Sequence, residues 1–224
     1  MHLPESLLSD GEGRALRLLK AYFAPLTGRD EGYTGGQWDT FDPSGTRSRS
    51  QNVFTADDVV SCSLLSVRPQ GRAAFDILVT RRERLTSLLE GIGPDRDLVS
   101  VDDFEGDFEP VRALYRELKS LPLVGETTAT KLIARKRPRL VPVVDRVVRQ
   151  TVFAGSPTQW EPLHTALRED GQVFHKRLVE LRDAVELPEA VSAIRIFDVL
   201  AWIEGTDNAA RALAGQPVVD PDLT

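Results

Sequence analysis

The sequence contains very little cysteine and histidine, and this shortage excludes several classes of site. Cys62 is the only cysteine in 224 residues, so the chain cannot form an internal disulfide. It lies in the apolar run VVSCSLLSV, where we expect a small buried side chain. The three histidines, His2, His164 and His175, are far apart in the sequence. A cysteine-rich zinc site or an iron–sulfur cluster does not fit this composition, and we expect no metal and no cofactor.

Long apolar runs are also missing. No stretch approaches the roughly 20 apolar residues that a membrane-spanning helix needs. The first residues, MHLPESLLSDGEG, have neither a basic segment nor the long apolar segment of a secretion signal. We therefore expect a soluble, cytoplasmic protein without a membrane partner.

Alternating strand patterns and repeats of fixed period are absent, whereas apolar stripes of helical period recur along the chain. These patterns predict an all-α fold. Thr55 is expected to cap one helix and Pro110 to stand near the start of another. The expected helices cover residues 11–24, 55–67, 71–80, 81–91, 109–119, 126–137, 158–169, 171–184, 189–204 and 206–214.

Two segments lack a helical pattern. Residues 25–53 are rich in Gly, Ser, Thr and Asp and carry the aromatic residues Tyr33, Trp38 and Phe41. A loop of this length is usually functional or disordered. Residues 216–224 are rich in proline and are expected to be frayed.

Positive charge is concentrated in one part of an acidic chain. The net charge is −6, which by itself argues against a general phosphate-binding surface. Between Glu126 and Gln150, however, seven basic residues stand against two acidic ones. This asymmetry indicates one surface that faces an anion, or else a solvated helix face that happens to be rich in arginine.

The same region, LPLVGETTATKLIARKRPRLVPVVDRVVRQ, predicts a helix, a hairpin and a second helix. Pro122 ends the first helix, Gly125 permits a turn, and Thr127 and Thr128 begin the next helix. Free N–H groups at the start of a helix form a natural phosphate site.

Asp145 stands alone among valines and arginines, three residues after Pro142. We expect it at or near a helix N-terminus, where the helix dipole stabilises a carboxylate. Two structural roles are open for it: a cap that bonds to the backbone, or an ion-pair partner of Arg149. In the later run 189–204, Arg195 and Asp198 are expected to form a buried ion pair.

The stretch from Leu121 to Asp145 resembles the helix-hairpin-helix (HhH-GPD) superfamily of base-excision DNA glycosylases, including the distance of 18 residues from Thr127 to Asp145. The whole chain also resembles an actinobacterial-type branch of it to which no reaction is assigned. The resemblance implies one compact unit, 1–224, of two interleaved helical lobes. The first lobe would span 55–150, with the helix-hairpin-helix at about 112–137, and the second would combine 1–54 with 151–215.

The resemblance also implies roles for named residues. Asp145 would stabilise the cationic sugar that develops when an N-glycosidic bond breaks, and the partner would be duplex DNA. The expected base-pocket aromatics are Tyr33, Trp38, Phe41 and Tyr115, each of which could equally pack in the core or a loop. The expected nucleic-acid contacts are Val124, Gly125, Thr127, Thr128, Lys131, Arg135, Lys136, Arg146 and Arg149.

Three features depart from the family pattern. Leu123 occupies a hairpin position that normally holds glycine, so a positive φ there would be strained. Thr127 replaces the lysine of strand-cleaving members, which excludes Schiff-base lyase chemistry. No cysteine cluster is present to hold an iron–sulfur centre.

Three hypotheses therefore stand. The first is a monofunctional DNA N-glycosylase, or a relative acting on a nucleoside bond, that depends on Asp145. The second is a non-catalytic helix-hairpin-helix module that binds DNA. The third is a helical adaptor whose basic helix meets an acidic protein partner.

Overall fold

The computed structural model describes residues 1–27 and 32–219, and every regular element within these ranges is helical. The all-α prediction is confirmed. The α-helices are α1 (Glu12–Tyr22), α2 (Ala56–Ser61), α3 (Gly71–Phe75), α4 (Arg82–Ile92), α5 (Phe104–Lys119), α6 (Glu126–Lys136), α7 (Arg146–Phe153), α8 (Trp160–Ala184), α9 (Ala193–Glu204) and α10 (Asn208–Leu213). Short 3-10 helices are η1 (Glu5–Leu7), η2 (Thr34–Gln37), η3 (Arg47–Arg49), η4 (Cys62–Leu65) and η6 (Leu98–Ser100), and η5 (Asp76–Thr80) is a π-helix.

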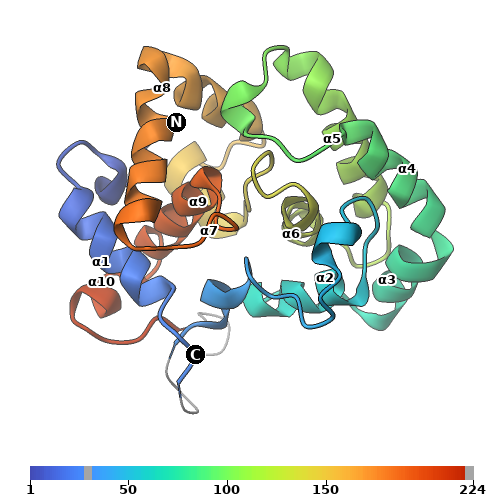
Figure 1. Cartoon of the computed structure of the whole chain (residues 1–224), viewed down its shortest axis with the longest axis horizontal. Helices are drawn as coiled ribbons and strands as arrows, with labels where there is room; N and C mark the ends of the chain where they lie inside the picture. Colours follow the sequence, from blue (N-terminus) through green and yellow to red (C-terminus); the bar gives the residue numbers. More distant parts are fainter. Residues whose placement is uncertain (28–31, 220–224) are drawn as a thin grey trace.

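The helices form two groups (Figure 1). Helices α1, α7, α8 and α10 pack against α9, whereas α2 and α5 pack against α6 and α4 packs against α5. Both central helices are buried on nearly all sides: ten of the twelve residues of α9 and nine of the eleven of α6 are inaccessible. A helix that is buried on nearly all sides must be covered by the rest of the chain, so α6 and α9 lie at the centres of the two groups.

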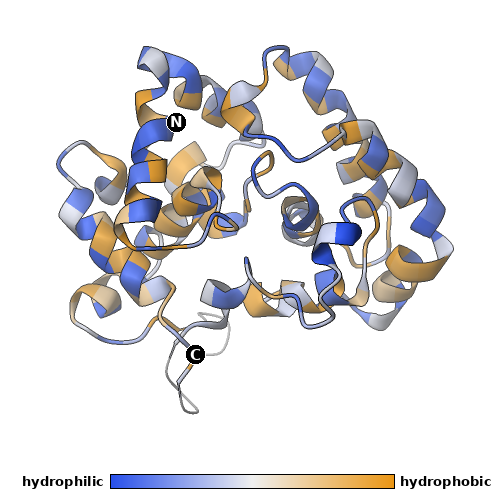
Figure 2. Ribbon diagram, viewed as in Figure 1, coloured by the Kyte–Doolittle hydropathy of each residue, from blue (hydrophilic) through white to orange (hydrophobic). Residues whose placement is uncertain are grey.

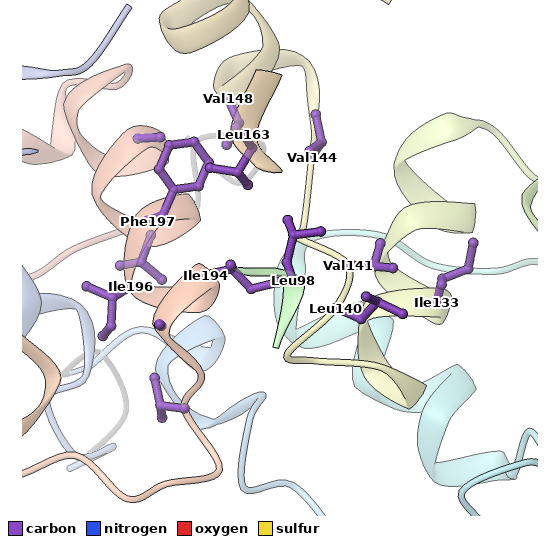
Figure 3. Close-up of a cluster of buried hydrophobic side chains, with 14 of the residues drawn as sticks. Leu98, Ile133, Leu140, Val141, Val144, Val148, Leu163, Ile194, Ile196 and Phe197 are labelled. Carbon is purple, nitrogen blue, oxygen red and sulfur yellow. The ribbon is translucent and has the colours of Figure 1, made fainter. Parts of the chain in front are cut away.

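The division between the groups differs from the expected one. Helix α7 packs against α9, so the first group ends before α7 rather than at residue 150. Residues 38–52 bind α6, as described below, and therefore do not belong with α9 as the expected 1–54 segment would require. Hydrophobic residues occur along the helices of both groups (Figure 2). Their side chains nevertheless join one core cluster, in which Leu98 and Ile133 of one group and Ile194 and Phe197 of the other take part (Figure 3).

Local signals place most helix ends correctly. Thr55 caps α2 in a reciprocal capping box with Asp58, as predicted. Pro110 is an exception, because α5 begins earlier, at Phe104, and the proline lies inside the helix. The expected break after residue 169 is present as a kink in α8, where residues 169–172 leave helical geometry.

The prediction that residues 216–224 are frayed is wrong for the part of this tail that the structure describes, residues 216–219. Val218 is 3% exposed, and the side chain of Asn208 exchanges two hydrogen bonds with the backbone of Val219. Residues 220–224, and residues 28–31 of the long loop, lie outside the described residues. Among the described helices, none combines the length and the apolar composition that crossing a bilayer requires.

Candidate functional site

A pocket of about 490 Å³ lies where the two groups of helices meet. Its walls come from α1, α6, α9 and the segment that enters α7, so residues far apart in the sequence share it. The side chains that matter below are Tyr22, Tyr33, Lys131, Asp145, Arg195 and Trp202. Small-molecule pockets occupy roughly 300–1,000 Å³, so this one has room for a single base with its sugar.

Asp145 lines this pocket as the N-cap of α7. Its Oδ1 accepts a hydrogen bond of 2.9 Å from the N–H of Val148, which confirms the predicted place at a helix N-terminus. Within the described part of the chain, Oδ2 makes no hydrogen bond. One oxygen therefore holds the start of α7, and the other is available to a bound molecule.

Gly205, at the end of α9, allows α7 to approach this closely. A β-carbon on Gly205 would lie 2.6 Å from Cγ1 of Val147 and 2.1 Å from Oγ1 of Thr151, both of which belong to α7. Real β-carbons do not approach other atoms this closely, so a larger residue at position 205 would force the side chains of Val147 and Thr151 to shift. The sequence analysis did not single out Gly205, because the contact joins two helices more than fifty residues apart.

A stacked aromatic pair forms one wall of the pocket. The rings of Tyr33 and Trp202 are 5.2 Å apart and nearly parallel, with an interplanar angle of 10°. Tyr22 meets both rings edge-on. Tyr33 is thus the one expected base-pocket aromatic that lines the same pocket as Asp145, and the sequence analysis missed Tyr22 and Trp202.

The other three expected aromatics lie elsewhere. Trp38 is 1% exposed and packs against Leu65, Ala134 and Val143, so it is a core residue. Phe41 is not part of the pocket lining, although its carbonyl oxygen accepts a hydrogen bond from Arg135. Tyr115 lines a separate pocket. These three corrections share a cause: sequence shows that an aromatic residue is present but not which neighbours surround it.

A buried charged cluster lies behind the aromatic wall. Arg195 donates to Asp198 at 2.5 Å, to Asp39 at 3.0 Å and to the hydroxyl of Tyr22 at 2.9 Å, so the predicted buried ion pair is confirmed and enlarged. Burial opposes the charge of Arg195, but Asp198, Tyr22 and Asp39 hold its pKa well above the usual value. Burial raises the pKa of Asp198 to about 7, and the nearby carboxylate of Asp39 adds to the effect, whereas Arg195 acts in the opposite direction.

Helix α6, which follows α5 after a short turn, borders the pocket through Thr127. The turn between the helices holds Leu123 at φ 62°, in the left-handed region, with 69% of its surface exposed. Gly125 is the N-cap of α6 and supplies no side-chain cap. The backbone N–H groups of the first turn of α6 are therefore not occupied by a capping side chain.

A model of one protein family matches residues 15–205, and the family is described as a family of unknown function, DUF6308. The chain belongs to the DUF6308 family. No curated protein and no solved structure matches it. The matched range includes Tyr33, Asp145 and Trp202, so almost the whole pocket lies within the part of the chain that defines the family.

In this DUF6308 chain, the basic residues at the end of α6 point into the protein. Arg135 and Lys136 are 2% and 5% exposed. Arg135 donates to the carbonyl oxygen of Trp38, and Lys136 donates to that of Ser50. Burial lowers the pKa of Lys136, although Asp58 works against this. The expectation that Arg135 and Lys136 contact phosphate is therefore wrong, because both side chains are used to hold the 38–52 loop.

The remaining expected nucleic-acid contacts are divided among several environments. Lys131 is 4% exposed, lines the pocket and contacts the carbonyl oxygen of Leu65. Arg146 is exposed at the pocket rim, whereas Arg149 pairs with Glu126 rather than with Asp145. The side chains of Val124 and Thr128 are buried, so only their backbone could meet a ligand.

Proposed function

We propose that this protein hydrolyses an N-glycosidic bond, in the manner of a monofunctional DNA N-glycosylase, with Asp145 as the catalytic carboxylate. The observation that carries the proposal is the position of Asp145: a helix N-cap with one carboxylate oxygen unoccupied, at the edge of a pocket walled by stacked aromatics. The resemblance of α5, the hairpin and α6 to the HhH-GPD superfamily supports the same assignment.

The chemistry needs little more than a fixed negative charge and a water molecule. The bond between the sugar C1′ and the base nitrogen breaks, and its electron pair leaves with the base. Positive charge develops on the sugar, where the carboxylate of Asp145 stabilises it. Water then bonds to C1′ and releases a proton to solvent, while the departing base nitrogen takes one up from solvent; Asp145 orients the attacking oxygen. Tyr33 and Trp202 line the pocket, so an extruded base would pack among aromatic side chains.

A second substrate class is a free nucleoside, and the burial of Arg135 and Lys136 favours it. Proteins bind duplex DNA mainly through its phosphates. Two of the side chains expected to bind these phosphates, Arg135 and Lys136, are instead buried and bonded to backbone carbonyl oxygens of the protein. The same burial removes the surface on which the adaptor hypothesis depended. DNA remains our first choice because the first turn of α6 and Arg146 are still accessible beside the pocket.

The test compares wild type with Asp145→Asn on duplexes that carry uracil, alkylated purines or 8-oxoguanine mispairs, and on free nucleosides. Release of base is read by alkaline strand scission for DNA and by chromatography for nucleosides. Asparagine caps a helix about as well as aspartate, so the variant keeps its fold. We expect roughly 10²–10⁴-fold slower release by Asp145→Asn.

Asp103→Asn is the matched control, because Asp103 is also an N-cap, bonded to the N–H of Gly106 at 3.1 Å, and lies outside the pocket. It should release base at the wild-type rate. The proposal fails if wild type releases no base from any of these substrates, or if Asp145→Asn is as fast as wild type.

A further inference from the structure

Asp145 enters the pocket of about 490 Å³ at the end of a connector, residues 137–145, that has no regular secondary structure. Functional groups on helices and strands are placed more precisely than those on irregular segments, which depend on supporting contacts. In this connector, such contacts are made by the two residues before Asp145. They come from α6 and α9, the helices at the centres of the two groups.

Asp198, in α9, binds the connector through a backbone N–H. Its Oδ2 accepts a hydrogen bond of 3.0 Å from the N–H of Val143, and its Oδ1 accepts one of 2.5 Å from Arg195. The carboxylate is buried, and the bond to Arg195 restricts its rotation. Helix α9 therefore holds the connector two residues before Asp145.

Thr130, in α6, binds the connector through a backbone carbonyl. Its hydroxyl lies 3.1 Å from the carbonyl oxygen of Val144, which belongs to the peptide bond that joins Val144 to Asp145. The carbonyl oxygen of Thr127, one turn earlier in α6, lies 3.2 Å from the same hydroxyl, so two acceptors share its single proton. Thr130 is 3% exposed, so water competes little for this bond.

The side chains of the two valines pack in separate hydrophobic clusters. Val144 belongs to the large core cluster, part of which is drawn in Figure 3. Val143 belongs to the small cluster that also contains Trp38, Leu65 and Ala134. Rotation of the connector about its own axis would remove both valines from their clusters, so packing and hydrogen bonds fix the same stretch of backbone.

We propose that Thr130 and Asp198 are positioning residues for Asp145. They fix the backbone on its N-terminal side, so that one carboxylate oxygen caps α7 while the other stays available to substrate. The catalytic part of this inference rests on the proposed cleavage of an N-glycosidic bond, whereas the positioning itself is measurable without substrate. A shift of about 1 Å in a group that acts on a substrate can cost about 10²-fold in rate.

Kinetics of Thr130 variants test the catalytic part. Thr130→Val keeps the shape of the side chain and removes the hydroxyl, whereas Thr130→Ser keeps the hydroxyl. On the substrate that wild type cleaves, Thr130→Val should lower kcat about tenfold and change KM by less than about twofold. Thr130→Ser should restore most of the lost kcat.

Asp198→Asn should lower kcat in the same way, because the amide nitrogen would face one of the two donors, Arg195 or the N–H of Val143. Ser61→Ala is the structural control. The buried hydroxyl of Ser61 donates to the carbonyl oxygen of Asp58 at 2.8 Å, and Ser61 does not line the pocket. Its loss should leave kcat unchanged.

Amide hydrogen exchange at Val148 tests the positioning without substrate, because this N–H donates to Oδ1 of Asp145. Thr130→Val and Asp198→Asn should each speed exchange at Val148 about threefold to tenfold relative to Val152 in the same helix. Asp145→Ala gives the upper limit of this ratio, and Ser61→Ala should leave it at the wild-type value.

The two readouts separate this inference from the proposed function. Faster exchange at Val148 in both variants, in a protein that releases no base, supports the positioning and refutes the glycosylase. Exchange that stays at the wild-type ratio in Thr130→Val and Asp198→Asn overturns the inference, whatever the activity. So does a kcat that falls equally in Thr130→Ser and Thr130→Val, or that falls as far in Ser61→Ala.

Discussion

Lys136 and Asp58 form a buried ion pair, with Nζ 2.5 Å from Oδ2 and both side chains 2% exposed. Asp58 also closes the capping box of α2, and Arg135 lies 3.4 Å from its other oxygen. The carboxylate of Asp58 thereby joins α2 to α6. Arg135 and Lys136 in turn donate to backbone carbonyl oxygens of the loop at 38–52, so the loop is held by the same cluster. The basic end of α6 stabilises the fold and is not a binding surface.

Lys136→Met should therefore act on stability. Removing one partner of a buried ion pair leaves the other charge uncompensated, at a cost of about 3–5 kcal/mol in the free energy of unfolding. Urea denaturation measures this directly. Lys20→Met, on the exposed side of α1, should change stability by less than about 0.5 kcal/mol. Equal, small effects of both substitutions would contradict the structural role of Lys136.

Leu123→Gly should stabilise the protein. Leucine at φ 62° costs roughly 1–2 kcal/mol relative to glycine, and the exposed side chain contributes little packing in return. Glycine has more conformational entropy in the unfolded chain, which works against this stabilisation. The expected net gain is therefore only about 0.5–1 kcal/mol. Val60→Gly, at an exposed site within α2, should instead destabilise by about 1 kcal/mol. A loss of stability in Leu123→Gly would show that this turn is not strained.

Gly205→Ala and Gly91→Ala should change stability in opposite directions. The added β-carbon at Gly205 meets Val147 and Thr151 and should cost about 1–3 kcal/mol through overpacking. At Gly91, in α4, nothing lies within 4 Å of the added carbon, so alanine should gain about 0.5–1 kcal/mol from helix propensity. Thermal unfolding of both variants provides the comparison. A neutral Gly205→Ala would mean that α7 and α9 are not in tight contact.

Glu204 should contribute stability that depends on pH. Burial alone would raise its pKa, but bidentate hydrogen bonds of 2.7 Å from Arg14 and one from the N–H of Ser6 hold it below the ordinary 4.5. An acid with a lowered folded-state pKa stabilises the fold above its unfolded pKa and loses that contribution as pH falls through the folded value.

Glu204→Gln should accordingly be less stable than wild type near pH 7, with the difference shrinking as the pH falls below about 4.5. Denaturation at several pH values measures this difference. Glu12→Gln, at an exposed position, should show a much smaller difference throughout. A constant difference for Glu204→Gln at every pH would exclude an ionic origin.

The sequence by itself determined the helical class, most helix boundaries, the capping role of Thr55 and the place of Asp145 at a helix N-terminus. These depend on interactions within a few residues: the period of apolar positions, the capping side chains, and the breaks at proline and glycine. The buried pairing of Arg195 with Asp198 was likewise foreseeable, because the two residues are one helical turn apart within an apolar run.

Only the tertiary structure decided which way the cations of α6 point, which aromatics share a pocket with Asp145, and why residue 205 is glycine. Arg135 binds the carbonyl of Trp38 across 97 residues, and Tyr33 stacks on Trp202 from the opposite end of the chain. Contacts over such separations arise from the packing of whole helices. A helical period shows that one face is buried, but it does not identify the residues that cover it.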